Sequence, residues 1–176
     1  LYKSCDNGKS FECLSVLPFA PWRRSYCSMI FAADGVLHAY AYNGYSEKEM
    51  DHAISKDCGK TWELLDPCYL AKRIRNPQTA HIDGVYVLHG RGGNEGGFVL
   101  YTSEDLTNWD EGTILVDKTH AGAFYSNNIN LSDENGNFLL INYSDTYDKS
   151  DPAANDPWCY KVNVMHINLR VKKNNC

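Results

Sequence analysis

The sequence predicts an all-β protein made of several β-propeller blades, and three observations support this prediction. A turn-like octet of the form S-x-D-x-G-x-[S/T]-aromatic occurs twice, 51 positions apart. Hairpin dipeptides recur with a similar spacing, and no helical 3.6-residue period is sustained along the chain. Two different turn types with one spacing indicate a repeat of about fifty residues, the size of a four-stranded blade.

The octets cover residues 4–11 and 55–62, and a shorter version without the glycine covers 103–109. Serine and aspartate can bond backbone groups of their own turn, glycine supplies a positive φ, and the aromatic residue packs between sheets. We therefore expect structural roles for Ser4, Asp6, Gly8, Ser55, Asp57, Gly59, Trp62, Ser103, Asp105 and Trp109. Such turns lie at the periphery of a propeller, which disfavours a catalytic role for their aspartates.

The hairpin dipeptides Asp34-Gly35, Asp83-Gly84 and Asn135-Gly136 set the order of the strands. The expected strands are 26–32, 36–42, 50–55 and 62–65, then 79–82, 85–89, 98–102 and 109–116, and finally 127–131, 138–143 and 162–171. They form a partial blade over 1–20 and blades over 25–68, 76–116 and 125–172, about three and a half in all.

Propellers close with about four to eight blades, so this array leaves open sheet edges. We expect a complete protein with six blades, of which this chain is the C-terminal part. Self-association of two open arrays is the alternative, and the isolated chain is expected to aggregate or dimerise.

The charge and composition exclude some functions. A net charge of -5 with 17 basic residues disfavours nucleic acid or anionic membrane as the main partner. No apolar run reaches the ~20 residues of a membrane span, and no signal peptide is visible. Seven cysteines, an odd number without zinc spacing, favour free thiols over disulfides. The sequence does not distinguish a cytoplasmic from a secreted protein.

Three features of the sequence resemble the sialidase superfamily. The two full octets look like its Asp boxes, also called bacterial neuraminidase (BNR) repeats. The stretch from Asn76-Pro77 to Arg91 resembles the blade that begins with Glu-Pro and ends in an active-site arginine, and Phe124-Tyr125-Ser126-Asn127 resembles the segment with the nucleophilic tyrosine. The resemblance implies a glycoside hydrolase for terminal, acidic sugars, in which Arg91 grips the sugar carboxylate and Tyr125 is the nucleophile.

This chain departs from that pattern in three ways. The glutamate expected to act as base falls on Asn76, and Ala123 and Phe124 stand where a second clamping arginine would precede Tyr125. The first arginine motif and the acid/base aspartate belong to earlier blades, so the segment alone is expected to be inactive. One alternative is therefore a non-catalytic propeller that binds glycans or proteins. Another is a glycosidase for neutral sugars that uses carboxylates, for which Glu47, Glu49, Glu95 and Glu111 are available.

Further residues could contact a carbohydrate partner. Arg75 and His89 join Arg91 and Asn76 as substrate-binding candidates, although a histidine at position 89 is more often a satisfied core residue. Loop arginines (Arg23, Arg24 and Arg73) and loop aromatics (Trp22, Tyr45, Tyr147 and Trp158) could line the mouth of the channel. No cofactor or metal is assigned. A calcium site at Asp145, Asp148, Asp151 and Asp156 is the alternative to a solvated loop.

Overall fold

A computed structural model of the chain describes residues 1–93, 96–117, 124–149 and 160–172. Every helix or strand in these ranges is a β-strand. The strands are β1 (Tyr2–Lys3), β2 (Glu12–Cys13), β3 (Arg24–Phe31), β4 (Leu37–Asn43), β5 (Glu49–Ser55), β6 (Glu63–Tyr69), β7 (Arg75–Ile82), β8 (Val85–Arg91), β9 (Phe98–Ser103), β10 (Thr113–Val116), β11 (Ser126–Asp133), β12 (Gly136–Lys149) and β13 (Tyr160–Leu169).

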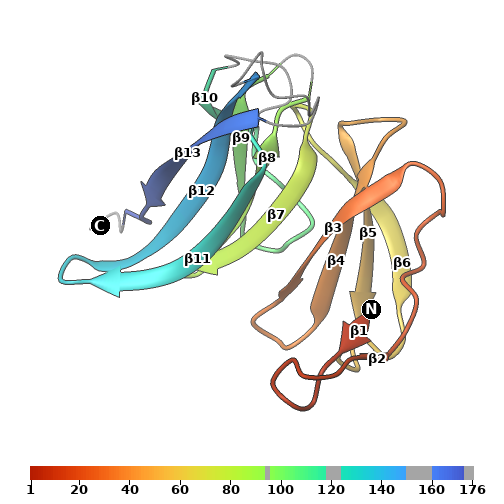
Figure 1. Cartoon of the computed structure of the whole chain (residues 1–176). Coiled ribbons are helices and arrows are strands. Elements are labelled where there is room, and N and C mark those ends of the chain that lie inside the picture. Colours follow the sequence, from red (N-terminus) through yellow and green to blue (C-terminus); the bar gives the residue numbers. More distant parts are fainter. Residues whose placement is uncertain (94–95, 118–123, 150–159, 173–176) are drawn as a thin grey trace.

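The strands form four antiparallel sheets in chain order (Figure 1). A two-stranded sheet of β1 and β2 comes first, and β3 to β6 and β7 to β10 form two four-stranded sheets. The last sheet contains β11, β12 and β13. The meander order within each sheet confirms the all-β prediction, and the fold is a partial β-propeller.

Two predicted strand starts are displaced by four residues in the structure. β7 begins at Arg75 instead of residue 79, because a β-bulge accommodates Asn76 and Pro77 between the paired positions Arg75 and Gln78. The proline has no N–H to donate, and a bulge is where a strand tolerates this. β10 begins only at Thr113, because the backbone first turns through Gly112, which has a φ of 65°.

The central sheet of β7 to β10 packs with both faces. Tyr86, Leu88 and Tyr101 belong to a buried cluster shared with β4, β5 and β6. The alternate residues Val87 and Phe98 belong to a second cluster, shared with β12. Side chains alternate between the two faces of a strand, so these strands are apolar on both sides.

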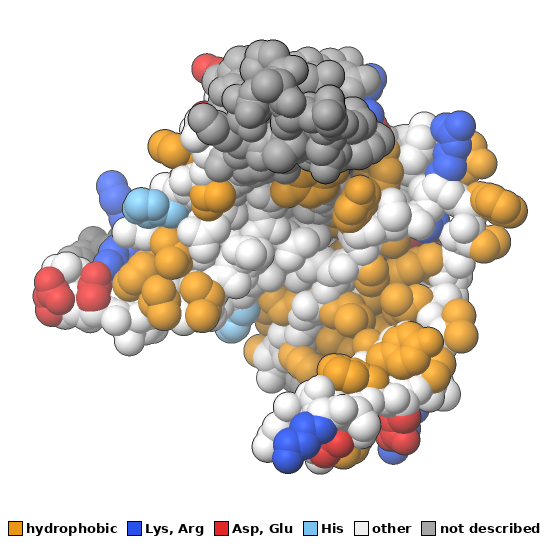
Figure 2. All heavy atoms as spheres, in the orientation of Figure 1, with side chains coloured by type: hydrophobic (Ala, Val, Ile, Leu, Met, Phe, Trp, Pro, Cys, Tyr) orange, Lys and Arg blue, Asp and Glu red, His pale blue; other side chains and the backbone are white. Residues whose placement is uncertain are grey.

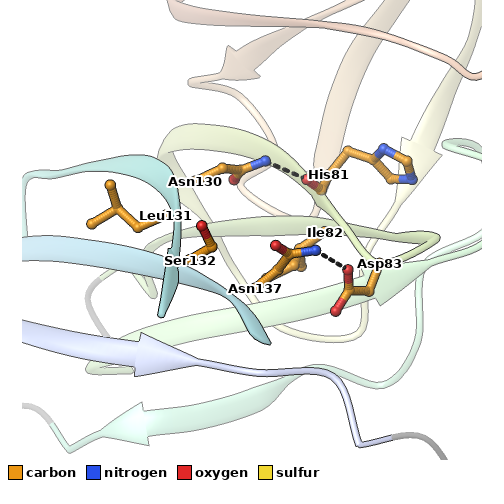
Figure 3. A pocket seen from close by; sticks show the side chains of 7 residues that line it. All are labelled: His81, Ile82, Asp83, Asn130, Leu131, Ser132 and Asn137. Atoms are coloured by element: carbon orange, nitrogen blue, oxygen red, sulfur yellow. Dashed lines mark hydrogen bonds between the residues drawn. The ribbon is translucent and has the colours of Figure 1, made fainter. Parts of the chain in front are cut away.

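Polar side chains join the neighbouring innermost strands β3, β7 and β11. Ser28 Oγ lies 2.8 Å from Thr79 Oγ1, between β3 and β7. Between β7 and β11, the amide nitrogen of Asn130 donates to the carbonyl oxygen of His81 at 2.7 Å (Figure 3). These side-chain hydrogen bonds link the innermost strands, which belong to separate sheets and have no backbone ladder between them.

The two outer sheets keep apolar side chains exposed. Figure 2 shows such side chains gathered over the sheet of β3 to β6 and over the β11–β12 hairpin. Met29 and Phe31 of β3 are 40 % and 54 % exposed, and Ile129 and Leu131 of β11 are 54 % and 40 % exposed. Exposed apolar sheet faces are typical of surfaces that another element covers. In the part of the chain that the structure describes, no helix is long and apolar enough to cross a membrane.

The octet turns are held by their own serine and aspartate side chains. In the second octet, Asp57 accepts hydrogen bonds from the backbone N–H groups of Lys60 and Thr61 at 3.1 Å and 2.9 Å. Hydrogen bonds from Thr61 lower the pKa of Asp57 to about 2. In the third octet, Leu106 takes the positive φ of 63° and is buried against Tyr40, whose hydroxyl donates to the Leu106 carbonyl at 2.5 Å. These turns lie at the opposite end of the sheets from the start of the innermost strands.

Candidate functional site

The three innermost strands begin at the same end of the molecule, the upper end in Figure 1. β3 begins at Arg24, β7 at Arg75 and β11 at Ser126. Their first residues, with the loops beside them, bring together several arginines, tyrosines and carboxylates. This end of the propeller is the candidate site.

Two β-bulges direct side chains at this end. The register between β3 and β4 shifts between Ser25 and Ser28, and Tyr26 takes a φ of 52° there. Asn76 occupies the corresponding bulge of β7 with a φ of 54°. A positive φ is uncommon outside glycine and tends to occur at functional sites. Bulges also re-aim side chains beside active sites, which matches the position of both residues.

A tyrosine cluster forms the centre of the site. The guanidinium carbon of Arg91 lies 5.5 Å from the centroid of the Tyr125 ring, within the range of a cation–π contact. The ring of Tyr26 lies 6.4 Å from that of Tyr125 and 6.4 Å from that of Tyr42. A hydrogen bond with Tyr125 is the main cause that raises the pKa of Tyr26. The structure thus brings the predicted residues Arg91 and Tyr125 into direct contact.

Glu47 joins this cluster to the arginines of β7 and of the segment before it. Its carboxylate accepts a hydrogen bond from the Tyr42 hydroxyl at 3.2 Å and forms a short ion pair with Arg75. Arg73 lies 3.9 Å from the other oxygen of the same carboxylate. Burial would lower the pKa of Arg75, and the hydrogen bond and charge of Glu47 outweigh this and raise it. Of the three described glutamates among those considered from the sequence (Glu47, Glu49 and Glu111), Glu47 is the one that pairs with arginines of this site.

Asp51 is a functional candidate that the sequence analysis missed. Its carboxylate pairs with the Arg24 guanidinium at 2.6 Å, and the side-chain amide of Asn43 lies 3.5 Å from its other oxygen. Asp51 is 9 % exposed and belongs to β5, next to the apolar residues Met50 and Ala53. An acidic residue inside a predicted strand, between Met50 and Ala53, was the available signal, because such a group is buried only with a charged partner.

Asn76 is buried without hydrogen bonds from its amide. It is 4 % exposed, and neither its side-chain oxygen nor its nitrogen has a partner among the described residues. The Nε of Arg91 is in the same situation. A buried polar group without a partner costs about 1–3 kcal/mol. Such groups are therefore expected to bind a ligand or an ordered water.

His89 lies away from solvent. Its ring is fully buried, with Nδ1 3.1 Å from Ser126 Oγ and Nε2 2.9 Å from the amide nitrogen of Asn128. Burial lowers the pKa of His89 to about 3, so the ring is neutral. The ring connects β8 to β11 behind the site, where it bonds to protein groups and does not face the mouth.

The site carries a surplus of positive charge. Arg23 and Arg24 lie 5.0 Å and 5.7 Å from the ring centroid of Tyr45, beside Arg73, Arg75 and Arg91. Among the described residues of the site, Glu47 and Asp51 are the carboxylates that pair with these arginines. Because the whole chain has a net charge of -5, this local surplus favours an anionic ligand.

No group of three or more metal-binding side chains occurs within the described ranges. The loop for which a calcium site was the alternative falls largely outside the described ranges. Glu95 and Trp158 also fall outside these ranges, and the side chain of Tyr147 is not described.

Comparison with known proteins supports the fold. No family model matches the chain, and no curated protein is similar to it in sequence. A GH93 alpha-L-arabinofuranosidase of Fusarium graminearum in complex with arabinobiose matches with a TM-score of 0.59 and 19 % identity, over 95 % of this chain and 53 % of that one. A mutant of the Fusarium graminearum alpha-L-arabinofuranosidase in complex with an iminosugar inhibitor matches with a TM-score of 0.60 and 19 % identity, over 96 % of this chain and 53 % of that one.

A Hadza microbial sialidase also matches, with a TM-score of 0.49 and 20 % identity over 82 % of this chain and 31 % of that one, which is too weak to carry an argument. The expected resemblance is thus confirmed for the propeller fold and not for the sialidase superfamily. The chain spans about half the length of the arabinofuranosidase structures that it matches.

Proposed function

We propose that this chain is part of a glycan-processing propeller, a glycoside hydrolase or a close relative, and that an acidic terminal sugar binds where β3, β7 and β11 begin. The observation that carries the proposal is the surplus of arginines over carboxylates at this site, next to three tyrosines in contact. Arginine binds a carboxylate in a bidentate manner, and aromatic rings offer faces to a sugar. The fold similarity to two carbohydrate-bound glycosidase structures supports a carbohydrate ligand.

In this proposal, Arg91 grips the sugar carboxylate and Tyr125 is the nucleophile. Arg75 is held by Glu47 at the rim of the site, and the unpartnered amide of Asn76 contacts the sugar. A tyrosine nucleophile needs a group that accepts its proton. Asn76 cannot be that group, so the acceptor must come from another part of the protein.

The same residue favours a second function, glycan binding without catalysis. Asn76 stands where the resemblance expects a base, and a buried neutral amide can orient a ligand but cannot take its proton. The third alternative, hydrolysis of neutral sugars, gives Glu47 the main role, since its carboxylate is at the site.

The proposal includes the surroundings of the site. We assign the three octets to Asp-box turns of the BNR repeat, with a structural role at the far end of the sheets. The exposed apolar faces of the outer sheets are then covered by further blades or by a second copy, which closes the ring.

Binding assays can test the proposal. We expect N-acetylneuraminic acid to bind more tightly than the neutral arabinobiose in isothermal titration calorimetry, because only the acid offers a carboxylate. Arg91→Ala should remove this preference. Arg170→Ala is the matched control, since Arg170 pairs with Asp133 at the opposite end of β11. Equal binding of the two sugars by the unmodified chain would reject the acidic-sugar assignment and favour the neutral-sugar alternative.

A further inference from the structure

A basic groove extends from the candidate site along the chain between β6 and β7. A pocket of about 370 Å³ lies beside the site and is lined by Tyr45, Glu47 and Arg75, among others. A second pocket of about 250 Å³ is lined by Lys72 and by glycines of the β8–β9 loop. Both pockets are lined by Lys48 and Arg73, so they are adjacent. We call the two together the basic groove.

The cations of the groove are held in place by protein groups. Lys72 Nζ donates to the carbonyl oxygen of Gly112 at 2.7 Å and also to that of Glu111. Arg73 and Arg75 both contact the carboxylate of Glu47. Of the described residues that line the groove, four are cationic (Lys48, Lys72, Arg73 and Arg75) and Glu47 alone is acidic. The groove therefore has a positive field in a chain of net charge -5.

Glycines shape the groove. A Cβ at Gly93, which has a φ of 68°, would collide with Oε2 of Glu47 and lie 3.2 Å from Arg73 Cβ. A Cβ at Gly92 would lie 3.0 Å from the backbone of Gly96. A side chain at Gly93 would displace Glu47 or Arg73, and one at Gly92 would crowd the backbone of Gly96 and Gly97. The β8–β9 loop can therefore lie this close to the two charged side chains only with glycine.

We infer that the basic groove binds the second and following units of an acidic oligosaccharide, whose terminal unit occupies the site at Arg91 and Tyr125. This inference rests on the proposed function and deepens it. Carboxylates spaced along a uronate chain match cations spaced along the groove, and arginine and lysine bind such groups with charge-assisted hydrogen bonds. The combined size is in the range of ligand sites, about 300–1,000 Å³.

Calorimetric titration with tetragalacturonic acid, its methyl ester and monomeric galacturonic acid tests the groove. We expect the tetramer to bind more tightly than the monomer, and the ester to lose most of this gain because it has no carboxylates. Lys48→Glu should raise the Kd of the tetramer by about tenfold, or about 1.4 kcal/mol, and leave that of the monomer nearly unchanged. Lys60→Glu is the matched control, since Lys60 lies in the second octet at the other end of the sheet.

The outcomes separate this inference from the proposed function. If Arg91→Ala raises the Kd of the monomer but Lys48→Glu leaves the Kd of the tetramer unchanged, the inference about the groove is wrong and the proposed site is supported. If Lys48→Glu raises the Kd of the tetramer but Arg91→Ala leaves the Kd of the monomer unchanged, the proposed site is wrong and the binding of acidic oligosaccharides in the groove is supported. Tetramer and ester of equal affinity, a short oligonucleotide that binds more tightly than the tetramer, or no binding of any probe would overturn the groove.

Discussion

The guanidinium of Arg91 and the ring of Tyr125 meet at a distance of 5.5 Å, although they come from two different sheets. Arg91 ends β8, and Tyr125 precedes β11. The contact therefore forms only when the sheet of β7 to β10 packs against that of β11 to β13.

Replacement of Arg91 by lysine tests whether its planar group is needed. Lys keeps the charge but loses the bidentate geometry and the stacking on Tyr125. We expect the Kd for N-acetylneuraminic acid to rise by about tenfold in calorimetry. Arg170→Lys is the control, because the guanidinium of Arg170 lies 4.7 Å from the Phe138 ring, away from the site. Equal affinity of the Arg91 variant and the unmodified chain would show that charge alone is recognised.

Tyr125→Phe distinguishes catalysis from binding. In a protein that carries the complete propeller, this variant should lose turnover of a fluorogenic sialoside, because it removes the phenol oxygen that we propose as the nucleophile, while the Kd of the free sugar changes little. Tyr2→Phe is the control on an exposed tyrosine of β1. Turnover that persists in Tyr125→Phe removes this residue from the mechanism. The absence of turnover in the unmodified protein, with binding intact, supports the non-catalytic alternative.

Three histidines make the fold sensitive to acid. Burial lowers the pKa of His52 to about 4 and that of His89 to about 3, and it also lowers that of His38. In the unfolded chain a histidine binds a proton near pH 6.5, so the unfolded state takes up protons first as the pH falls. Stability should therefore decrease from pH 6.5 downward, by up to about 2 kcal/mol at pH 5 for His52 or His89.

Urea unfolding at pH 7 and pH 5 measures this effect. His89→Gln should reduce the difference in unfolding free energy between the two pH values, since glutamine does not titrate. His166→Gln is the control on a histidine of β13. The octet aspartates titrate in a separate range, since the pKa of Asp6 and that of Asp57 are lowered to about 2. Equal stability at pH 7 and pH 5 would contradict the burial of neutral histidines.

Asn76→Gly tests whether the buried side chain of Asn76 lowers the free energy of unfolding. Glycine adopts the φ of 54° without strain and removes two unpartnered buried atoms. We expect the free energy of unfolding to rise by about 1 kcal/mol while sugar binding weakens. Gln78→Gly, two residues further along β7, should lower stability as a glycine in a regular strand does. A loss of stability in Asn76→Gly would mean that its amide is satisfied, for example by water.

Much of the fold could be predicted from local signals. The hairpin dipeptide Asp83-Gly84 gives the turn between β7 and β8, where both residues have a positive φ. The start of β7 could not be predicted, because the proline after Asn76 normally breaks a strand. Only the bulge, which depends on pairing with β8, accommodates it.

The site was predictable only in part. Arg91 and Tyr125 came from the family resemblance, and their contact depends on the packing of two sheets. Glu47 was one of several glutamates in loops, and nothing local marked it. Its place follows from topology, because β4 runs antiparallel to β3 and so ends where β3 begins. Long-range ion pairs such as that between Glu47 and Arg75 cannot be read from sequence spacing.

A crystal structure with bound N-acetylneuraminic acid tests most directly whether an acidic sugar binds where the innermost strands begin. We predict the sugar carboxylate within hydrogen-bonding distance of Arg91, with the ring next to Tyr125. The other end of these strands has a polar pocket of about 500 Å³, lined by Asp83, Asn130 and Asn137 among others (Figure 3). A sugar bound in that pocket, with the arginines unoccupied, would contradict the account.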